Sequence, residues 1–303
     1  MDIFTKKVKK FILLRNKIQQ VLFDQNKNNA FYENYIVKVK TGGTKSNPVE
    51  VSVKIDFQNM KNNGATIPEK NRLTAYDKAI HNAIVTLYDA GNNYFTSNMI
   101  SNVLSGDKEY ENGKPKSVTM NNFRKIISSL EKIGQTTIEI DTSEESRAFN
   151  QEEYRYSGNL LNFNFEKGMF LNNNSVYYCV HLLSSPPLLE YSRLRKQLSS
   201  ADIKLLRVLS NRSTHIAIKC YLLQELLWMK YSKQRQRVIR YDTLQKYLGL
   251  TFSGSQDNIL HQRKKLRDNV KKCFDYWVSM KFIKEYAEEK ERNEFSKIVI
   301  KKL

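Results

Sequence analysis

Residues 258–280 combine the residue types that a DNA-reading helix needs. Apolar residues recur on one face at helical spacing: Ile259, Leu266, Val270, Cys273, Phe274 and Trp277. A helix in the major groove needs such a packed back and a polar front that reaches base edges and phosphates. We predict that the DNA-reading positions of this front and its margins are His261, Arg263, Lys264, Lys265, Arg267, Lys271 and Lys272. The alternative is a cationic surface helix without a ligand.

A basic segment precedes this helix. Between Glu225 and Asp242 the chain has no acidic residue. We predict that this segment contacts phosphates, which positions a protein on DNA without reading sequence. The residues concerned are Lys233, Arg235, Arg237 and Arg240.

A third group lies on a helix predicted over residues 118–133. It comprises Asn121, Arg124 and Lys125, since Asn can read adenine and Arg can read guanine. The surrounding region also carries acidic segments around residues 143–145 and 152–153. An ordinary solvated helix in a protein–protein domain is therefore an equal alternative to DNA contact.

Positive charge is distributed unevenly along the 303 residues. Lys and Arg number 50 against 31 Asp and Glu, which gives a formal net charge of +19. The net charge is +7 over residues 1–70, −2 over residues 71–185 and +14 over residues 186–303. An AT-rich genome enriches lysine without any function, but it should do so evenly. The basic last third therefore indicates a localised site for a polyanion.

Composition excludes several classes of protein. With 40% hydrophobic residues the chain can bury real cores, which rules out wholesale disorder. Apolar runs are too short to span a membrane, and the first ten residues lack the pattern of a secretory signal. The three cysteines, at positions 179, 220 and 273, are isolated and fit a reducing cytosol. We expect a cytoplasmic protein that does not contact membranes.

Sequence motifs of enzymes are absent. The glycines do not form a phosphate-binding loop with the required lysine. The four histidines lie far apart, and no pair has metal-ligand spacing. A tyrosine recombinase would need His-x-x-Arg, and Lys264 occupies the arginine position after His261. We therefore expect no enzymatic activity, no catalytic residue, no metal and no cofactor.

The first 70 residues differ in pattern from the rest. Residues 1–25 place apolar side chains at three- and four-residue steps and predict an amphipathic helix, with a lysine-rich face that is either solvated or in contact with DNA. Residues 31–40 and 49–57 predict a β-hairpin. Residues 58–69 are rich in turn formers and predict a linker.

The remaining chain predicts the same order of elements twice. After residue 71 we expect helices over 74–90, 96–104 and 118–133, then strands over 136–141, 160–165 and 176–183. Ser184-Ser185-Pro186-Pro187 marks a boundary. Beyond it we expect helices over 188–197, 201–210, 214–233, 241–248 and 258–280, then strands over 282–286 and 295–301. Helix, short helix, long helix and hairpin is the order of a winged helix.

We therefore predict an α+β, mainly helical fold with two tandem winged-helix domains and an N-terminal extension of a helix and a β-hairpin. The predicted boundaries are residues 1–70 for the extension, 71–185 for the first winged helix and 186–303 for the second. The first winged helix would serve dimerisation or auxiliary DNA contact. The second, basic one would supply the main DNA binding.

Residues 73–85 (LTAYDKAIHNAIV), with Gly91-Asn92 and Phe95-Thr96 after them, resemble the opening of replication initiator proteins of bacterial plasmids and mobile elements. Leu198-Ser199-Ser200-Ala201-Asp202 to Leu209 and the basic last helix resemble their second winged helix. The resemblance covers about residues 71–303 and leaves the first 70 residues unassigned.

The resemblance implies binding to directly repeated origin sequences in double-stranded DNA, a homodimer formed through the first winged helix, and recruitment of host helicase and primase. It places DNA reading on the basic residues of the last helix named above. Two other classes stay open. One is a phage or plasmid transcriptional regulator without an initiation role, and the other is an interaction scaffold whose basic face is incidental.

Overall fold

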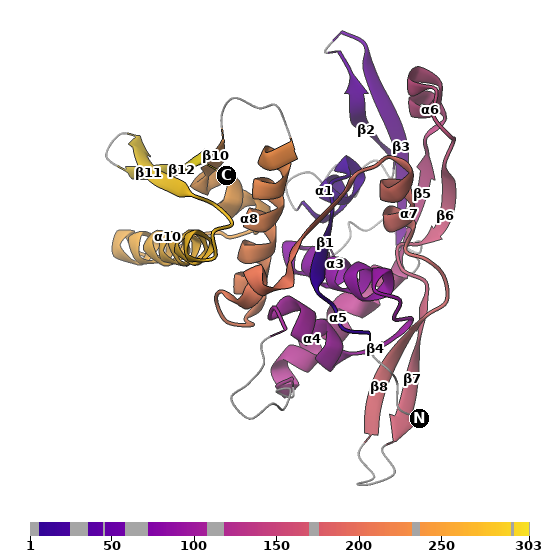
Figure 1. Cartoon of the computed structure of the whole chain (residues 1–303), viewed down its shortest axis with the longest axis horizontal. Helices are drawn as coiled ribbons and strands as arrows, with labels where there is room; N and C mark the ends of the chain where they lie inside the picture. The colour runs from indigo at the N-terminus through magenta and orange to yellow at the C-terminus, as the bar shows by residue number, and fades with distance from the viewer. Residues whose placement is uncertain are drawn as a thin grey trace.

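Helices alternate with small antiparallel sheets along the chain, which gives an α+β fold (Figure 1). The computed structural model describes residues 6–24, 36–44, 46–57, 72–107, 118–169, 176–231, 237–291 and 294–302. The predicted linker at 58–69 lies outside these described residues, and so do Lys233 and Arg235.

A first repeat of helices and strands occupies the middle of the chain. Its sheet has the order β4–β8–β7, and both strand pairs are antiparallel. Thr74 begins the first helix with a capping box, in which Thr74 and Asp77 each accept a hydrogen bond from the other's backbone N–H. The elements are α3 (Ala75–Asp89), β4 (Tyr94–Thr96), α4 (Ser97–Leu104), α5 (Met120–Gln135), β7 (Phe163–Met169) and β8 (Val176–Leu182).

The last third of the chain has the same order of elements, except that its described part has no counterpart of residues 136–159 of the middle region. Its elements are α8 (Ser213–Tyr231), β10 (Val238–Arg240), α9 (Tyr241–Tyr247), α10 (Gln256–Ser279), β11 (Glu285–Glu291) and β12 (Glu294–Lys302). The sheet order is β10–β12–β11, so the third strand again lies between the first and the second. The sequence predicted the helices of both repeats within a few residues, but it missed the short strands β4 and β10.

The predicted β-hairpin is present, and it belongs to a larger sheet. Its strands β2 (Ile36–Gly43) and β3 (Pro48–Phe57) continue into β5 (Thr136–Asp141) and β6 (Arg155–Asn159), in the order β2–β3–β5–β6. Val53 pairs with Ile140, and Ile55 pairs with Ile138. The hairpin is therefore joined to the middle of the chain by backbone hydrogen bonds. The sequence missed β6 and the helix α6 (Ser143–Phe149), which lie between β5 and β7.

The predicted helix over residues 1–25 is wrong over residues 6–16. Lys10–Leu14 forms β1, which pairs antiparallel with β9 (Leu198–Asp202). The helix α1 (Lys17–Phe23) begins only after Asn16, whose side chain accepts a hydrogen bond from the backbone N–H of Gln19. An unbroken apolar run at residues 11–14 satisfies helical and strand patterns alike, and the strand partner lies far along the chain.

The predicted helix over residues 201–210 is also wrong. After α7 (Pro187–Leu194) the chain forms β9 and then the 3₁₀ helix η2 (Ile203–Arg207). The side chain of Asp202 accepts a hydrogen bond from the backbone N–H of Lys204 and so caps the 3₁₀ helix η2. Pairing with β1 holds the serines and Ala201 in extended conformation.

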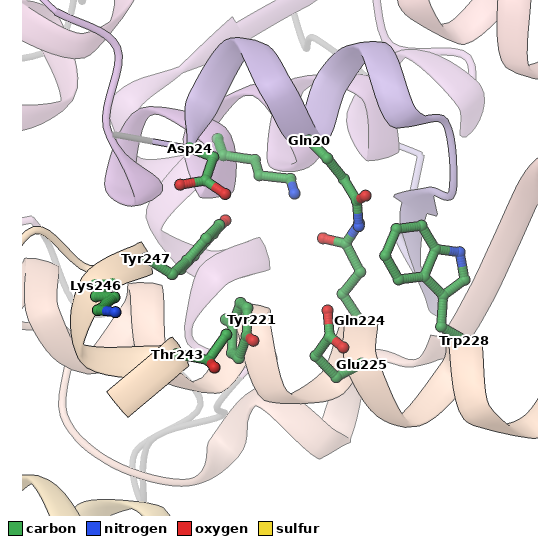
Figure 2. A pocket seen from close by; sticks show the side chains of 10 residues that line it. Gln20, Asp24, Tyr221, Gln224, Glu225, Trp228, Thr243, Lys246 and Tyr247 are labelled. Atoms are coloured by element: carbon green, nitrogen blue, oxygen red, sulfur yellow. The ribbon is translucent and has the colours of Figure 1, made fainter. Parts of the chain in front are cut away.

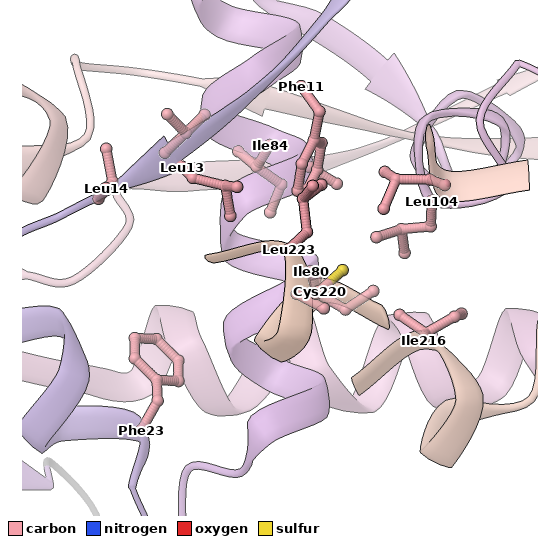
Figure 3. Close-up of a cluster of buried hydrophobic side chains, with 14 of the residues drawn as sticks. Phe11, Leu13, Leu14, Phe23, Ile80, Ile84, Leu104, Ile216, Cys220 and Leu223 are labelled. Atoms are coloured by element: carbon pink, nitrogen blue, oxygen red, sulfur yellow. The ribbon is translucent and has the colours of Figure 1, made fainter. Parts of the chain in front are cut away.

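One hydrophobic core joins the N-terminal strand to both repeats. Figure 3 shows Phe11 and Leu13 of β1 beside Ile80 and Ile84 of α3, with Leu223 of α8 next to them. All five side chains are fully buried. Strand pairs thus cross the predicted boundaries at residues 70 and 185. The division into three domains stays a prediction.

Polar contacts also tie the two repeats together. Arg207 of η2 donates from Nε to the carbonyl of Gly106 at 2.9 Å and from Nη2 to that of Asp107 at 2.8 Å, at the end of α4. Trp277 of α10 donates from Nε1 to the carbonyl of Leu205 at 2.9 Å. The first two bonds satisfy backbone carbonyls in the turn that follows α4, and the third satisfies a carbonyl of η2.

Candidate nucleic-acid interface

The helix α10 has the packed back that its sequence predicts. Leu266, Val270, Cys273, Phe274 and Trp277 are buried, and four of the five are fully inaccessible. Ser255 begins the helix by accepting a hydrogen bond from the backbone N–H of Asn258. The burial of this stripe fixes the rotation of the helix about its axis, so the opposite face points to solvent.

The predicted DNA-reading residues of α10 fall into two groups by exposure. Arg267 and Lys271 are partly buried against the hairpin β11–β12. The exposed group comprises His261, Arg263, Lys264, Lys265 and Lys272.

Glu288 of β11 is the centre of the contact between α10 and the hairpin. Arg267 donates to its two carboxylate oxygens, from Nε at 2.8 Å and from Nη2 at 3.0 Å. Lys271 Nζ lies 3.5 Å from Oε2 of Glu288, and the hydroxyl of Tyr241 in α9 donates to Oε1 at 2.6 Å. The Glu288 side chain is only 9% exposed. It therefore links α9, α10 and β11 through bonds to a charged acceptor, which are the stronger kind.

The electrostatics of Glu288 favour its ionised form. Burial acts to raise the pKa of this carboxyl, but the hydrogen bonds from Arg267 and Tyr241 and the charges of Arg267 and Lys271 outweigh it, so the pKa lies below its ordinary value. Burial and the bond to Glu288 raise the pKa of Tyr241. The Arg267 guanidinium also stacks on Phe295, with its central carbon 3.3 Å from the ring centre.

An open groove of about 860 Å³ runs between α9, the first half of α10 and β12. Arg240, Arg263, Lys264 and Arg267 line it, together with the acids Asp242 and Glu291. Arg240, which immediately precedes α9, has its Nη1 3.5 Å from Glu291. Arg237 lies just before β10 and is partly buried.

The predicted residues of the first repeat lie on the exposed side of α5. Asn121, Arg124 and Lys125 are all exposed. Lys125 Nζ donates to the hydroxyl of Ser213, the first residue of α8, at 3.4 Å. The structure therefore brings α5 next to the beginning of α8, although 88 residues separate the two contacting positions.

Sequence reasoning missed Glu288, Tyr241 and Phe295, which hold Arg267 in place. One signal was available. Tyr286 and Glu288 are two residues apart in a strand and so face the same side. The Tyr286 hydroxyl donates to Asp275 of α10 at 2.5 Å, and Glu288 binds Arg267. Polar side chains at alternate positions of an acidic strand, beside a basic helix, indicate ion pairs and hydrogen bonds from one face of the strand to that helix.

A second pocket, of about 390 Å³, lies between α1, α8 and α9. Figure 2 shows Gln20 facing Gln224, and Tyr221 beside Tyr247, with Trp228 at one side. The Tyr221 and Tyr247 rings are 4.4 Å apart between centres. Burial holds the pKa of both tyrosines well above the ordinary value, so they stay neutral hydrogen-bonding groups.

In the described ranges, no three His, Cys, Asp or Glu side chains gather as a metal site would require. None of the helices in those ranges has the length and apolarity needed to cross a bilayer. All three cysteines are buried, and burial raises the pKa of each thiol, which disfavours the reactive thiolate.

Comparison with known proteins finds distant structural neighbours. No family model matches the chain, and no curated protein matches it. A crystal structure of selenomethionine derivatives of domains 2 and 3 of RctB has a TM-score of 0.41 and 11% identity, over 95% of this chain and 96% of that chain. Another crystal structure of RctB domains 2–3 has a TM-score of 0.44 and 12% identity, over 93% and 95%. Similarities with TM-scores below 0.5 do not assign a family or a function to this chain.

Proposed function

We propose that the chain is a sequence-specific binder of double-stranded DNA and a replication initiator of a plasmid or mobile element. The observation that supports DNA binding is the arrangement of α10. Its apolar back is buried, its cationic front is exposed, and a β-hairpin is fixed beside it through Arg267 and Glu288. Exposed cations on a rigid helix can reach base edges and phosphates together.

The order of elements supports two winged helices. In each repeat a helix, a short strand, two helices and a hairpin occur in this order, with β5, α6 and β6 inserted before the hairpin of the first repeat, and the third strand of each three-stranded sheet lies between the other two. In the second repeat α10 would enter the major groove and β11–β12 would be the wing along the backbone. Arg237 and Arg240, next to β10 and α9, would contact phosphates.

The first repeat would play the lesser electrostatic role. Its region has a net charge of −2, against +14 for residues 186–303. We assign it auxiliary DNA contact through Asn121, Arg124 and Lys125, and formation of a homodimer. The initiator role itself rests on the resemblance of residues 73–85 and 198–209 to plasmid initiators. It includes origin repeats as the DNA target, host helicase and primase as partners, and the bacterial cytoplasm as the location.

A footprint on the DNA that flanks the protein's own gene tests the proposal. We expect several protected sites with a common sequence, arranged as direct repeats, and affinity that falls steeply as salt rises. A single protected operator without repeats would favour a transcriptional regulator. A flat salt response would contradict DNA binding altogether. We propose no catalytic role, so purified protein should neither cleave DNA nor hydrolyse ATP.

A further inference from the structure

A cluster of basic residues lies on the side of α10 that faces away from the hairpin. We call it the basic seam and define it as Lys125, Arg212, His215, Lys265 and Lys272. These residues come from α5, from the turn before α8, from the first turn of α8 and from α10. Four of the five are exposed, and His215 is partly buried.

Two hydrogen bonds and the charges on α10 place these side chains near one another. Lys125 Nζ donates to Ser213 Oγ at 3.4 Å, which brings α5 to the beginning of α8. Ser210 Oγ lies 2.8 Å from Nδ1 of His215, which holds the imidazole in the same turn. Lys265 and Lys272 of α10 are near enough that their charges act on His215.

Positive charges from two helices act on His215. Burial is the largest cause that lowers the pKa of His215, and the charges of Arg212, Lys219, Lys265 and Lys272 lower it further. Arg212 and Lys219 belong to α8 and the turn before it, and the two other lysines belong to α10. Together with the Ser210 hydroxyl they are the charged and polar groups that act on the imidazole.

The seam differs from the hairpin side of α10 in its ion pairs. On the hairpin side, Arg267 and Lys271 are matched by Glu288. Among the described residues, no carboxylate lies within ion-pair distance of Arg212, Lys265 or Lys272. Like charges held close without acids repel each other, and an extended anion relieves that repulsion.

We propose that the basic seam binds the phosphate backbone of the duplex that α10 enters, so that one DNA molecule contacts both repeats. The inference rests on the proposed function and adds a site to it, since Arg212 and His215 were not among the sequence-predicted residues. Because Lys125 lies on α5 and Lys265 and Lys272 on α10, a backbone along the seam crosses the junction between the repeats. The buried core and the Arg207 bonds keep that junction rigid.

Proton uptake follows from this placement. Free His215 is held neutral by burial and by its cationic neighbours. A phosphate beside it opposes these positive charges and so favours the imidazolium. Binding of DNA should therefore take up a proton at His215, and affinity should rise as the pH falls from about 8 to about 6, through the range where histidine titrates.

The first test is the salt dependence of duplex binding. Replacing Arg212, Lys265 and Lys272 with Ala should lower the slope of log K against log salt by about one per lost phosphate contact. The matched control replaces three exposed basic residues outside the seam and outside the proposed DNA contacts, Arg147, Lys38 and Lys40, with Ala. This control removes the same charge, and its salt slope should stay within a few tenths of the wild-type slope. Circular dichroism verifies that both variants are folded.

The second test is calorimetry of DNA binding near pH 7 in two buffers of different ionisation enthalpy. The wild-type protein should take up a fraction of one proton, up to one. His215→Gln should abolish the uptake, whereas His181→Gln, a histidine on β8, should retain it.

The outcomes separate this inference from the proposed function. Equal salt slopes in the seam and control variants, or unchanged proton uptake in His215→Gln, would overturn the seam while duplex binding stands. Equal displacement of the duplex by single-stranded RNA or by anionic phospholipid vesicles would assign the seam to another polyanion and would also overturn it. Absence of duplex binding by the wild-type protein would overturn the proposed function itself.

Discussion

Arg267 and Glu288 form a bidentate ion pair, 2.8 and 3.0 Å long, between the middle of α10 and strand β11. The pair fixes the hairpin against the helix, since Tyr241 and Lys271 converge on the same carboxylate. Arg267 therefore has a structural role beside its predicted contact with DNA. Variants of Arg267 must therefore be tested for folding as well as for DNA binding.

We expect Glu288→Gln to weaken the fold and to change its pH dependence. The pKa of Glu288 is lowered in the folded protein, so its stabilisation is present above the unfolded value of about 4.3 and is lost as the pH falls through the folded value. The variant should lose about 1–2 kcal/mol at pH 7, because Arg267 is partly exposed, and its stability should vary less between about pH 5 and 3. Urea unfolding over this range measures both effects.

The matched control is Glu285→Gln in the same strand. Glu285 pairs with Lys301, and both side chains are more than half exposed, so the change should cost less than about 0.5 kcal/mol. If Glu285→Gln were as destabilising as Glu288→Gln, the central role of Glu288 would be contradicted.

We expect the second repeat to dominate DNA affinity. Replacing Lys264, Arg267 and Lys271 together with Ala should lower the salt slope by about one per phosphate contact and cost about 1–3 kcal/mol per base contact. Lys264→Ala by itself separates contact from folding, because Lys264 is exposed and Arg267 is not. Fluorescence anisotropy with an origin duplex measures the affinity.

The variant to compare with that triple replacement combines Arg124→Ala and Lys125→Ala in α5. This variant should lose less affinity and is expected to change dimer formation or the choice of half-site. If it lost binding while the C-terminal triple variant kept it, the assignment of α10 as the principal recognition helix would be wrong.

We expect Arg195→Met to destabilise the protein by about 3–5 kcal/mol, because it leaves a buried carboxylate without its partner. Arg195 Nε donates to Glu145 at 2.7 Å, and the two side chains are 2% and 3% exposed. The hydroxyl of Tyr191 also donates to Glu145, at 3.1 Å. Thermal and urea unfolding measure the loss. Arg147→Ala, an exposed position on α6, is the control and should stay within about 0.5 kcal/mol of wild type.

We expect His81 to make the fold sensitive to mild acid. Burial, then the charge of Lys78, lowers its pKa to about 3, so the folded protein keeps it neutral while the unfolded chain binds a proton below about pH 6.5. Stability should therefore fall by up to about 1.4 kcal/mol per pH unit as the pH drops from 6.5. His81→Leu should flatten this slope in urea unfolding, whereas the exposed His261→Gln should not. If His81→Leu kept the wild-type slope of stability against pH, another group would be responsible for the acid sensitivity.

The sequence by itself determined the elements whose signals are local. The capping box of Thr74 and Asp77 begins α3. The apolar stripe from Leu266 to Trp277 is buried and sets the rotation of α10, so most of the basic side chains of this helix face solvent. Capping and helical periodicity act over a few residues, so they can be read without knowledge of the rest of the fold. The basic character of the last third is likewise a property of composition.

Only the tertiary structure decided which distant segments meet. Phe11 pairs with Ala201 and Ile55 with Ile138, and no local pattern specifies a strand partner at such separations. The same physics limits prediction of the site. Helical periodicity gives the face on which a cation lies but not its neighbour, so it could not show that Arg267 meets Glu288 while Lys265 and Lys272 act on His215. Those neighbours depend on packing between segments far apart in the chain.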